Sequence, residues 1–150
     1  MEKKKPFSKS TTIDELALHE RRLNDFARST SGRFWEMDAN LRFVYFSSNV
    51  EEITGVPPQW HYGKTRAELG IPESVDVEQW QAHLDTLQRG EPFSNFIFQR
   101  SGPDGLKWMQ TSGTPLFAES GEFAGYRGNA TDVTVQVLAE QRGQELADAI

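Results

Sequence analysis

The chain has 150 residues, of which 37% are hydrophobic and 25% are charged, and its net charge is −6 at neutral pH. These values are typical of one globular domain rather than of a disordered or fibrous chain. The acidic balance, with a basic cluster only at residues 3–5, argues against nucleic-acid binding. No apolar run approaches the roughly 20 residues of a membrane helix, so no membrane association is expected.

The amino-terminal lysines precede no apolar stretch, so we expect no secretory signal and a cytoplasmic protein. The sequence also contains no cysteine. This excludes a disulfide framework, a thiolate metal site, a cysteine nucleophile and a covalent cysteine–flavin adduct, and it fits a reducing compartment. No other metal site is predicted.

Residues 1–11 are predicted to form a disordered basic tail, and residues 12–31 are predicted to contain an amphipathic helix. Thr12 and Glu15 have the spacing of a capping box, which satisfies backbone amides where a helix begins. Apolar residues then recur close to a 3.6-residue period. Because the stripe is narrow, we expect it to pack against the same helix of a second subunit. The residues predicted for this homodimer interface are Ile13, Leu16, Leu23 and Phe26.

Strands and helices are predicted in turn over the middle of the chain. Residues 34–47 read as a hairpin of two aromatic-rich strands. A short helical segment at 50–54 follows, and residues 65–75 are predicted to be irregular. Residues 76–90 form a longer helix whose apolar side carries Val77, Trp80, Leu84 and Leu87.

The second half of the chain is predicted to consist of strands followed by a helix. The strands span residues 93–100, 106–117 and 122–130, and hairpin turns join them. Thr131 or Asp132 then caps the final helix. If the first and last strands pair, the fold class is α+β, with a five-stranded antiparallel sheet, helices on one face, and flanking helices at both ends.

Four segments in this order and spacing resemble a PAS domain: residues 34–47, 50–64, 106–117 with the Gly-Pro-Asp-Gly turn before them, and 121–134. The resemblance covers residues 33–134. It is greatest to the cytoplasmic PAS modules that precede histidine kinases and cyclic-di-GMP synthases or hydrolases.

The resemblance implies a sensory or dimerisation module that is not an enzyme. In the PAS family the sheet and the helices enclose a pocket for a small ligand, and the signal leaves through a terminal helix that begins at an Asp-X-Thr motif. Here that motif is Asp132-Val133-Thr134, and residues 135–150 would connect it to a downstream effector. From the residues alone, Asp132 and Thr134 can hydrogen-bond to the margin of the sheet, whereas the simpler alternative is that Asp132 is only a helix cap.

The residues predicted to supply the core, and any ligand pocket within it, are large and apolar, and each contributes on the order of 2–3 kcal/mol on burial. The inward phase of residues 93–99 stays open, because Phe93 and Ile97 compete for the core with two other phenylalanines. The candidates are Trp35, Met37, Trp80, Phe96, Phe98 and Trp108.

The side chain of Arg127 has two possible roles. The resemblance to flavin-binding relatives implies that its side chain faces the pocket, where a guanidinium would favour a small anionic ligand. The alternative is an ion pair with Glu36 or Asp38, which share one face of the first strand. Both interpretations are kept.

Two residues bear on cofactors, for which no specific prediction is made. Arg66 stands where the resemblance to light-oxygen-voltage domains, a flavin-binding PAS branch, would require the photoreactive cysteine. His83 lies on the helix where haem-binding PAS domains place their iron ligand, but one histidine without a further motif does not predict haem.

The leading hypothesis is therefore a homodimeric PAS module that relays a change induced by a ligand or a partner to an effector outside this chain. A constitutive dimerisation module without a ligand is the first alternative. A small-molecule-binding enzyme is the second, although the sequence offers no nucleophile–base pair or carboxylate dyad at a suitable spacing.

Overall fold

We describe a computed structural model of the chain, which covers residues 15, 17–19, 21, 22, 25 and 32–149. The predicted tail lies outside the described residues, and so do all four residues assigned to the dimer interface. These four are Ile13, Leu16, Leu23 and Phe26.

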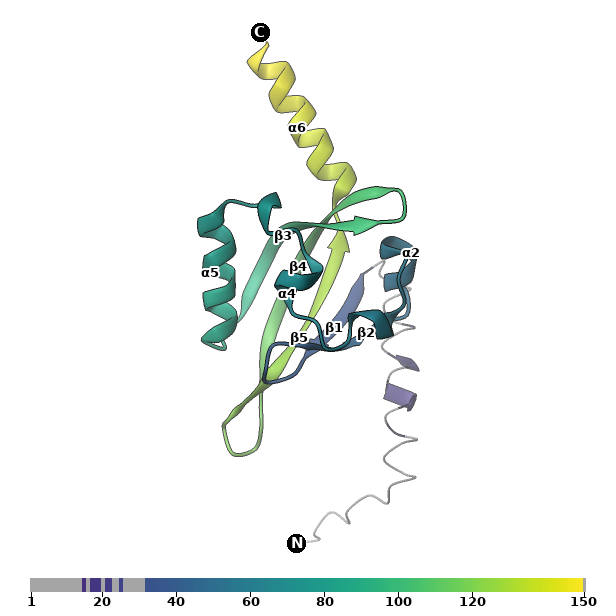
Figure 1. Cartoon of the computed structure of the whole chain (residues 1–150), viewed down its shortest axis with the longest axis vertical. Helices are drawn as coiled ribbons and strands as arrows, with labels where there is room; N and C mark the ends of the chain where they lie inside the picture. The colour runs from purple at the N-terminus through teal and green to yellow at the C-terminus, as the bar shows by residue number, and fades with distance from the viewer. Residues whose placement is uncertain (1–14, 16, 20, 23–24, 26–31, 150) are drawn as a thin grey trace, which may run out of the picture.

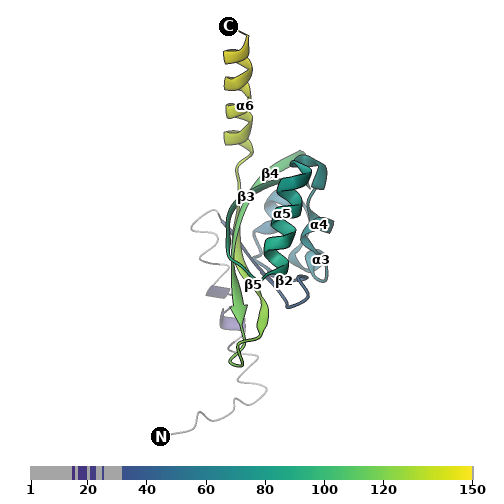
Figure 2. The same cartoon turned by 90° about the vertical axis from the view of Figure 1, so that its left-hand side faces the viewer.

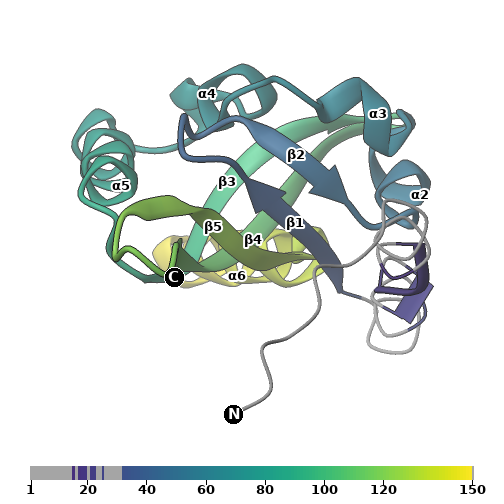
Figure 3. The same ribbon diagram turned by 90° about the horizontal axis from the view of Figure 1, so that it is seen from below.

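The predicted fold class is confirmed. The sheet has five antiparallel strands in the order β2-β1-β5-β4-β3, so the first and last strands of the chain pair at its centre. Figures 1 and 3 show the short helices and α5 along one face of this sheet. In chain order the elements are β1 (Arg33–Met37), β2 (Phe43–Phe46), α2 (Val50–Thr54), α3 (Pro58–His61), α4 (Arg66–Leu69), a 3₁₀ turn (Pro72–Ser74), α5 (Val77–Gln88), β3 (Phe93–Gly102), β4 (Gly105–Phe117), β5 (Phe123–Asp132) and α6 (Thr134–Asp148).

Strand alternation gives the sheet two different faces. We call the face under the helices the inner face and the opposite one the outer face. In β1 the residues Trp35 and Met37 point inward and are buried, whereas Phe34 and Glu36 point outward. The core is therefore a layer of large side chains between the inner face and the helices.

Trp35 crosses the centre of the inner face and requires glycine beneath it. A Cβ atom on Gly128, its partner across β1 and β5, would collide with the indole ring and with the Ser112 carbonyl oxygen of β4. The indole Nε1 donates to Thr111 Oγ1 at 3.0 Å and to the Asn129 carbonyl at 3.1 Å. This single residue therefore joins three strands.

An irregularity near the start of β3 decides the phase that the sequence left open. The register shifts between Phe93 and Phe96, and Asn95 within this bulge has a φ of 59°. As a result Phe93, Phe96 and Phe98 all contact the core, whereas Ile97 faces outward.

Helix α6 stands apart from this core. None of its residues is buried, and Figures 1 and 2 show it extending beyond the end of the sheet, away from α5. No helix in the part of the chain that the structure describes is long and apolar enough to cross a membrane.

Candidate functional site

The first turn of α4 places an arginine inside the domain. Arg66 is only 4% exposed. Its guanidinium carbon lies 5.0 Å from the ring centroids of Trp35 and Phe43, and 5.1 Å from that of Phe98. Three aromatic ring systems therefore surround this cation.

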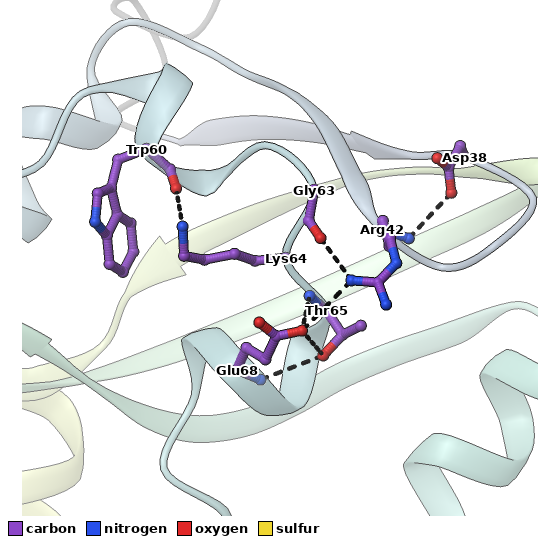
Figure 4. Close-up of polar contacts among 7 residues, drawn as sticks. All are labelled: Asp38, Arg42, Trp60, Gly63, Lys64, Thr65 and Glu68. Carbon is purple, nitrogen blue, oxygen red and sulfur yellow. Dashed lines mark hydrogen bonds and ion pairs between the residues drawn. The ribbon is translucent and has the colours of Figure 1, made fainter.

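A capping box fixes α4, and with it Arg66. The Thr65 hydroxyl accepts from the Glu68 amide, while the Glu68 carboxylate accepts from the Thr65 amide at 3.3 Å. Arg42 ties this turn to β2, because its Nη1 donates to the Gly63 carbonyl at 2.6 Å and lies 3.5 Å from Glu68 Oε1. Figure 4 shows these contacts converging around Glu68. The prediction of an irregular segment is wrong here, because Thr65 and Glu68 have the spacing of a capping box and α4 follows.

A second buried arginine lies on β3. Arg100 is 6% exposed, and its Nη2 donates to His61 Nε2 at 2.9 Å. His61 Nδ1 lies 3.0 Å from the Pro57 carbonyl. Because Arg100 can only donate, His61 is a neutral imidazole that accepts at Nε2 and donates at Nδ1. Burial and the Arg100 charge lower the pKa of His61 to about 4.

Arg66 and Arg100 line one cavity between the sheet and the short helices. Its volume is ≈ 20 Å³. The other walls are mainly apolar, and two of them come from the strands that lead to α6, since Met109 belongs to β4 and Ala130 to β5. Arg33 of β1 also lines this cavity and approaches Glu52 at 4.0 Å.

Burial dominates the protonation of both buried arginines. It lowers the pKa of Arg66 to about 9, with a further contribution from the Arg100 charge, and it lowers the pKa of Arg100 to about 10. Both guanidinium groups therefore stay charged at neutral pH.

Arg127 lies on the outer face. Its Nε donates to Glu36 Oε1 at 2.8 Å, and the arginine side chain is about half exposed. This geometry is the ion pair of the second interpretation, and Arg127 does not line the cavity between the sheet and the helices. A hollow of ≈ 500 Å³ lies beside the pair, but most of its lining belongs to the outer face, including Ser112, Thr114 and Asn129.

Trp35, Met37, Trp80 and Phe98 are buried in the core, as expected, and Phe96 packs against it. Trp108 differs from the expectation. It pairs with Gln99 on the outward side of β3 and β4, and its neighbour Met109 points into the core instead. Trp108 and Met109 are adjacent large apolar residues, so strand alternation by itself allows either of them to face the core.

His83 is packed among aromatic rings. Its imidazole stacks on Phe96 with the centroids 3.8 Å apart and the planes 5° from parallel. The Phe93 ring is nearly perpendicular to it, with the two ring centroids 4.7 Å apart. Burial, assisted by the Arg66 charge, lowers the pKa of His83 to about 3. The residue therefore acts in the fold as a neutral aromatic side chain.

The cavity between the sheet and the short helices leaves little room for an organic cofactor. Small-molecule pockets usually measure about 300–1,000 Å³, whereas the cavity under the helices measures ≈ 20 Å³. Arg66, and not a cysteine, projects into that space. In the described part of the chain, no three histidine, aspartate or glutamate side chains form a group that could hold a metal ion.

The Asp-X-Thr motif joins β4 to the start of α6. The Thr134 hydroxyl donates to Asp132 Oδ1 at 2.5 Å and accepts from the Trp108 amide at 2.9 Å. The Thr134 amide donates to the same Asp132 oxygen at 2.9 Å, and the Val133 amide donates to the Trp108 carbonyl at 2.8 Å. Asp132 therefore does more than cap a helix, because it orients the hydroxyl that binds β4.

Solved structures share this architecture. An RNA-binding light-oxygen-voltage receptor matches with a TM-score of 0.72 and 21% identity over 99% of this chain and 41% of the other. A sensory box histidine kinase/response regulator from Burkholderia thailandensis matches with a TM-score of 0.63 and 18% identity, over 82% of this chain and 92% of that one. The N-terminal domain of a diguanylate cyclase with a PAS/PAC sensor from Marinobacter aquaeolei matches with a TM-score of 0.58 and 18% identity, over 70% and 97%.

These likenesses show the fold, and the chain spans less than half the length of the light-oxygen-voltage receptor that it matches. No curated protein sequence matches the chain. The model of the PAS fold family matches residues 29–138, which include the whole sheet, all the short helices and the root of α6. The chain therefore belongs to the PAS family.

Proposed function

We propose that this chain is a cytoplasmic, homodimeric PAS sensory module that passes a change inside the domain to an effector beyond α6. It has no catalytic role of its own in this proposal. The effector would be a histidine kinase or a cyclic-di-GMP enzyme, because structural neighbours include PAS domains of both kinds of protein. Residues 12–31 would supply much of the dimer interface.

One observation supports the relay most directly: the cavity and the root of α6 share a strand. Met109 lines the cavity and pairs with Asp132 across β4 and β5. The adjacent Trp108 makes the backbone hydrogen bonds to Val133 and Thr134. A displacement of β4 at Met109 would therefore alter the direction in which α6 leaves the sheet. A ligand would act by favouring one of two such arrangements.

The geometry also supports a second candidate, a constitutive dimerisation module. The interior is nearly filled by side chains, and the cavity of ≈ 20 Å³ leaves little room for an organic ligand. In that case α6 would keep one direction under all conditions.

Spin labels on two introduced cysteines would test the relay, and the absence of natural cysteine makes the labelling specific. Asp104→Cys marks the hairpin between β3 and β4, and Gln141→Cys marks α6; labelled chain is diluted with unlabelled chain to suppress distances between subunits. We expect one narrow distance distribution in the parent and in Thr134→Ser, and a broad one in Thr134→Val. Equal distributions in all three would contradict the relay. Native mass spectrometry of the same samples reports the subunit number and any retained ligand.

A further inference from the structure

Arg66 and Arg100 carry two positive charges in the interior without a counter-charge. Among the described residues, the ion pairs of arginine involve Arg33, Arg42, Arg89 and Arg127, and neither buried cation takes part. Arg66 Nε and Nη2, and Arg100 Nε, are buried and have no hydrogen-bond partner. The hydrogen bond from Arg100 Nη2 to His61 ends on a neutral ring.

This arrangement is energetically costly as it stands. Burying an unpaired charge costs several kcal/mol for each ion. The aromatic rings around Arg66 offset part of its cost through cation–π contacts, but they do not offset the cost of burying Arg100. A third component that accepts hydrogen bonds and carries negative charge would offset the cost for both groups.

The cavity beside the two guanidinium groups limits what that component can be. At ≈ 20 Å³ it holds one occupant of about the size of a water molecule. Water fits this site less well than an anion, because its two hydrogens need acceptors and most of the lining is either cationic or apolar, including Val50, Ile53 and Met109. The one hydroxyl in the lining, that of Thr54, is already engaged, because it donates to the Val50 carbonyl at 2.8 Å and accepts from the Val56 amide at 3.4 Å. A monoatomic anion only accepts, and therefore matches the excess of donors.

We propose that Arg66 and Arg100 bind a small inorganic anion of halide size in the cavity between the inner face of the sheet and the short helices. The anion links α4 to β3 and contacts the same space as Met109 of β4. The binding of the anion does not depend on the proposed function. A role of the anion as the sensed signal does rest on the proposed function.

The first test measures the melting temperature of the full chain in sodium chloride, sodium bromide and sodium gluconate at one ionic strength. We expect chloride and bromide to raise the melting temperature in a saturable manner and gluconate, which is too large for the cavity, to have no such effect. Arg66→Met keeps the length of the side chain and removes the charge, so the halide dependence should disappear. Arg127→Met is the matched control on the outer face and should keep it. Halide dependence that survives in Arg66→Met, or that is absent from the parent, would overturn the proposal.

The second test does not depend on a variant that folds. Crystals of the parent chain soaked in sodium bromide should show an anomalous peak within hydrogen-bond distance of Arg66 Nη2 and Arg100 Nε. An interior without such a peak would overturn the proposal. The distances between the spin labels at positions 104 and 141 distinguish the anion site from the relay. If bromide binds but these distances do not change with halide, the anion site is retained and the sensory role of the ion is contradicted. Distances that depend on Thr134, with no bromide peak, would contradict the anion site alone.

Discussion

The two faces of the sheet hold arginine in opposite ways. On the outer face Arg127 lies opposite Glu36 in register, and the pair forms one ion pair in contact with solvent. On the inner side Arg66 and Arg100 are almost fully buried and line one cavity, and neither forms an ion pair with a described carboxylate. Arginine therefore forms an ion pair at the surface in one place, and leaves buried guanidinium nitrogens without hydrogen-bond partners in the other.

The largest effect that we predict separates two adjacent residues of β5. Gly128→Ala places a methyl group against the Trp35 ring and the Ser112 carbonyl on the inner side, and should lower the free energy of unfolding by about 3 kcal/mol. Asn129→Ala faces outward and should change it by no more than about 0.5 kcal/mol. Urea unfolding followed by tryptophan fluorescence measures both. Similar losses in the two variants would show that the faces are assigned wrongly.

Acidification should destabilise the inner side selectively. His61 and His83 have folded-state pKa values near 4 and 3, below the value of about 6.5 in an unfolded chain. The unfolded chain therefore binds more protons between these values, so the stability is complete above about pH 6.5 and is lost as the pH falls. We expect the free energy of unfolding to decrease by about 1.5 kcal/mol between pH 7.5 and pH 6, with about half of this loss from each histidine.

His83→Phe is the variant that sharpens the pH prediction, because phenylalanine can keep the stack on Phe96 and does not titrate. Its loss of stability over the same pH range should be smaller than that of the parent. An identical pH dependence in the two chains would mean that His83 is not a buried neutral group.

A smaller effect is expected where β5 meets the end of α5. The buried Tyr126 hydroxyl donates to the Glu91 carbonyl at 2.8 Å and lies 3.1 Å from the Thr86 carbonyl. Tyr126→Phe keeps the ring and removes the donor, so it should cost about 1 kcal/mol in denaturant unfolding. The outward-facing Thr131→Ala serves as a control with little effect. If Tyr126→Phe left the free energy of unfolding unchanged, the two carbonyl groups would be hydrogen-bonded to water in the variant.

The smallest effect belongs to the outer ion pair. Arg127→Met should change the free energy of unfolding by less than about 1 kcal/mol, and the change should shrink further in high salt, because exposed ion pairs contribute little. A loss of several kcal/mol would indicate that this pair is more than a surface contact.

The fold could be predicted because its signals are local. Alternation in β1 put Trp35 and Met37 on one side and Glu36 on the other, and the turn residues marked both later hairpins. The bulge at Asn95 could not be predicted, because the alternation pattern does not show where one extra residue is inserted into a strand.

The candidate site was harder to predict than the fold. An arginine in a polar segment reads as exposed, and nothing local shows that Trp35, Phe43 and Phe98 from three different strands surround Arg66. Arg127 attracted attention through a family resemblance, whereas its alternation with the buried Tyr126 would have placed it outward. The Asp132–Thr134 motif could be recognised because it is contiguous in sequence, and its part in a relay stays a prediction. Its hydrogen-bond partner Trp108 was assigned to the core.

The coupling of the inner site to the root of α6 is tested most directly by the amide resonances of Trp108 and Val133. These two amides form the hydrogen bonds that join β4 to the start of α6. We predict that Arg66→Met shifts both resonances in a ¹⁵N–¹H spectrum, whereas Arg127→Met, on the other face of the same sheet, leaves them in place. Unchanged resonances in Arg66→Met, or equal shifts in the two variants, would contradict the account.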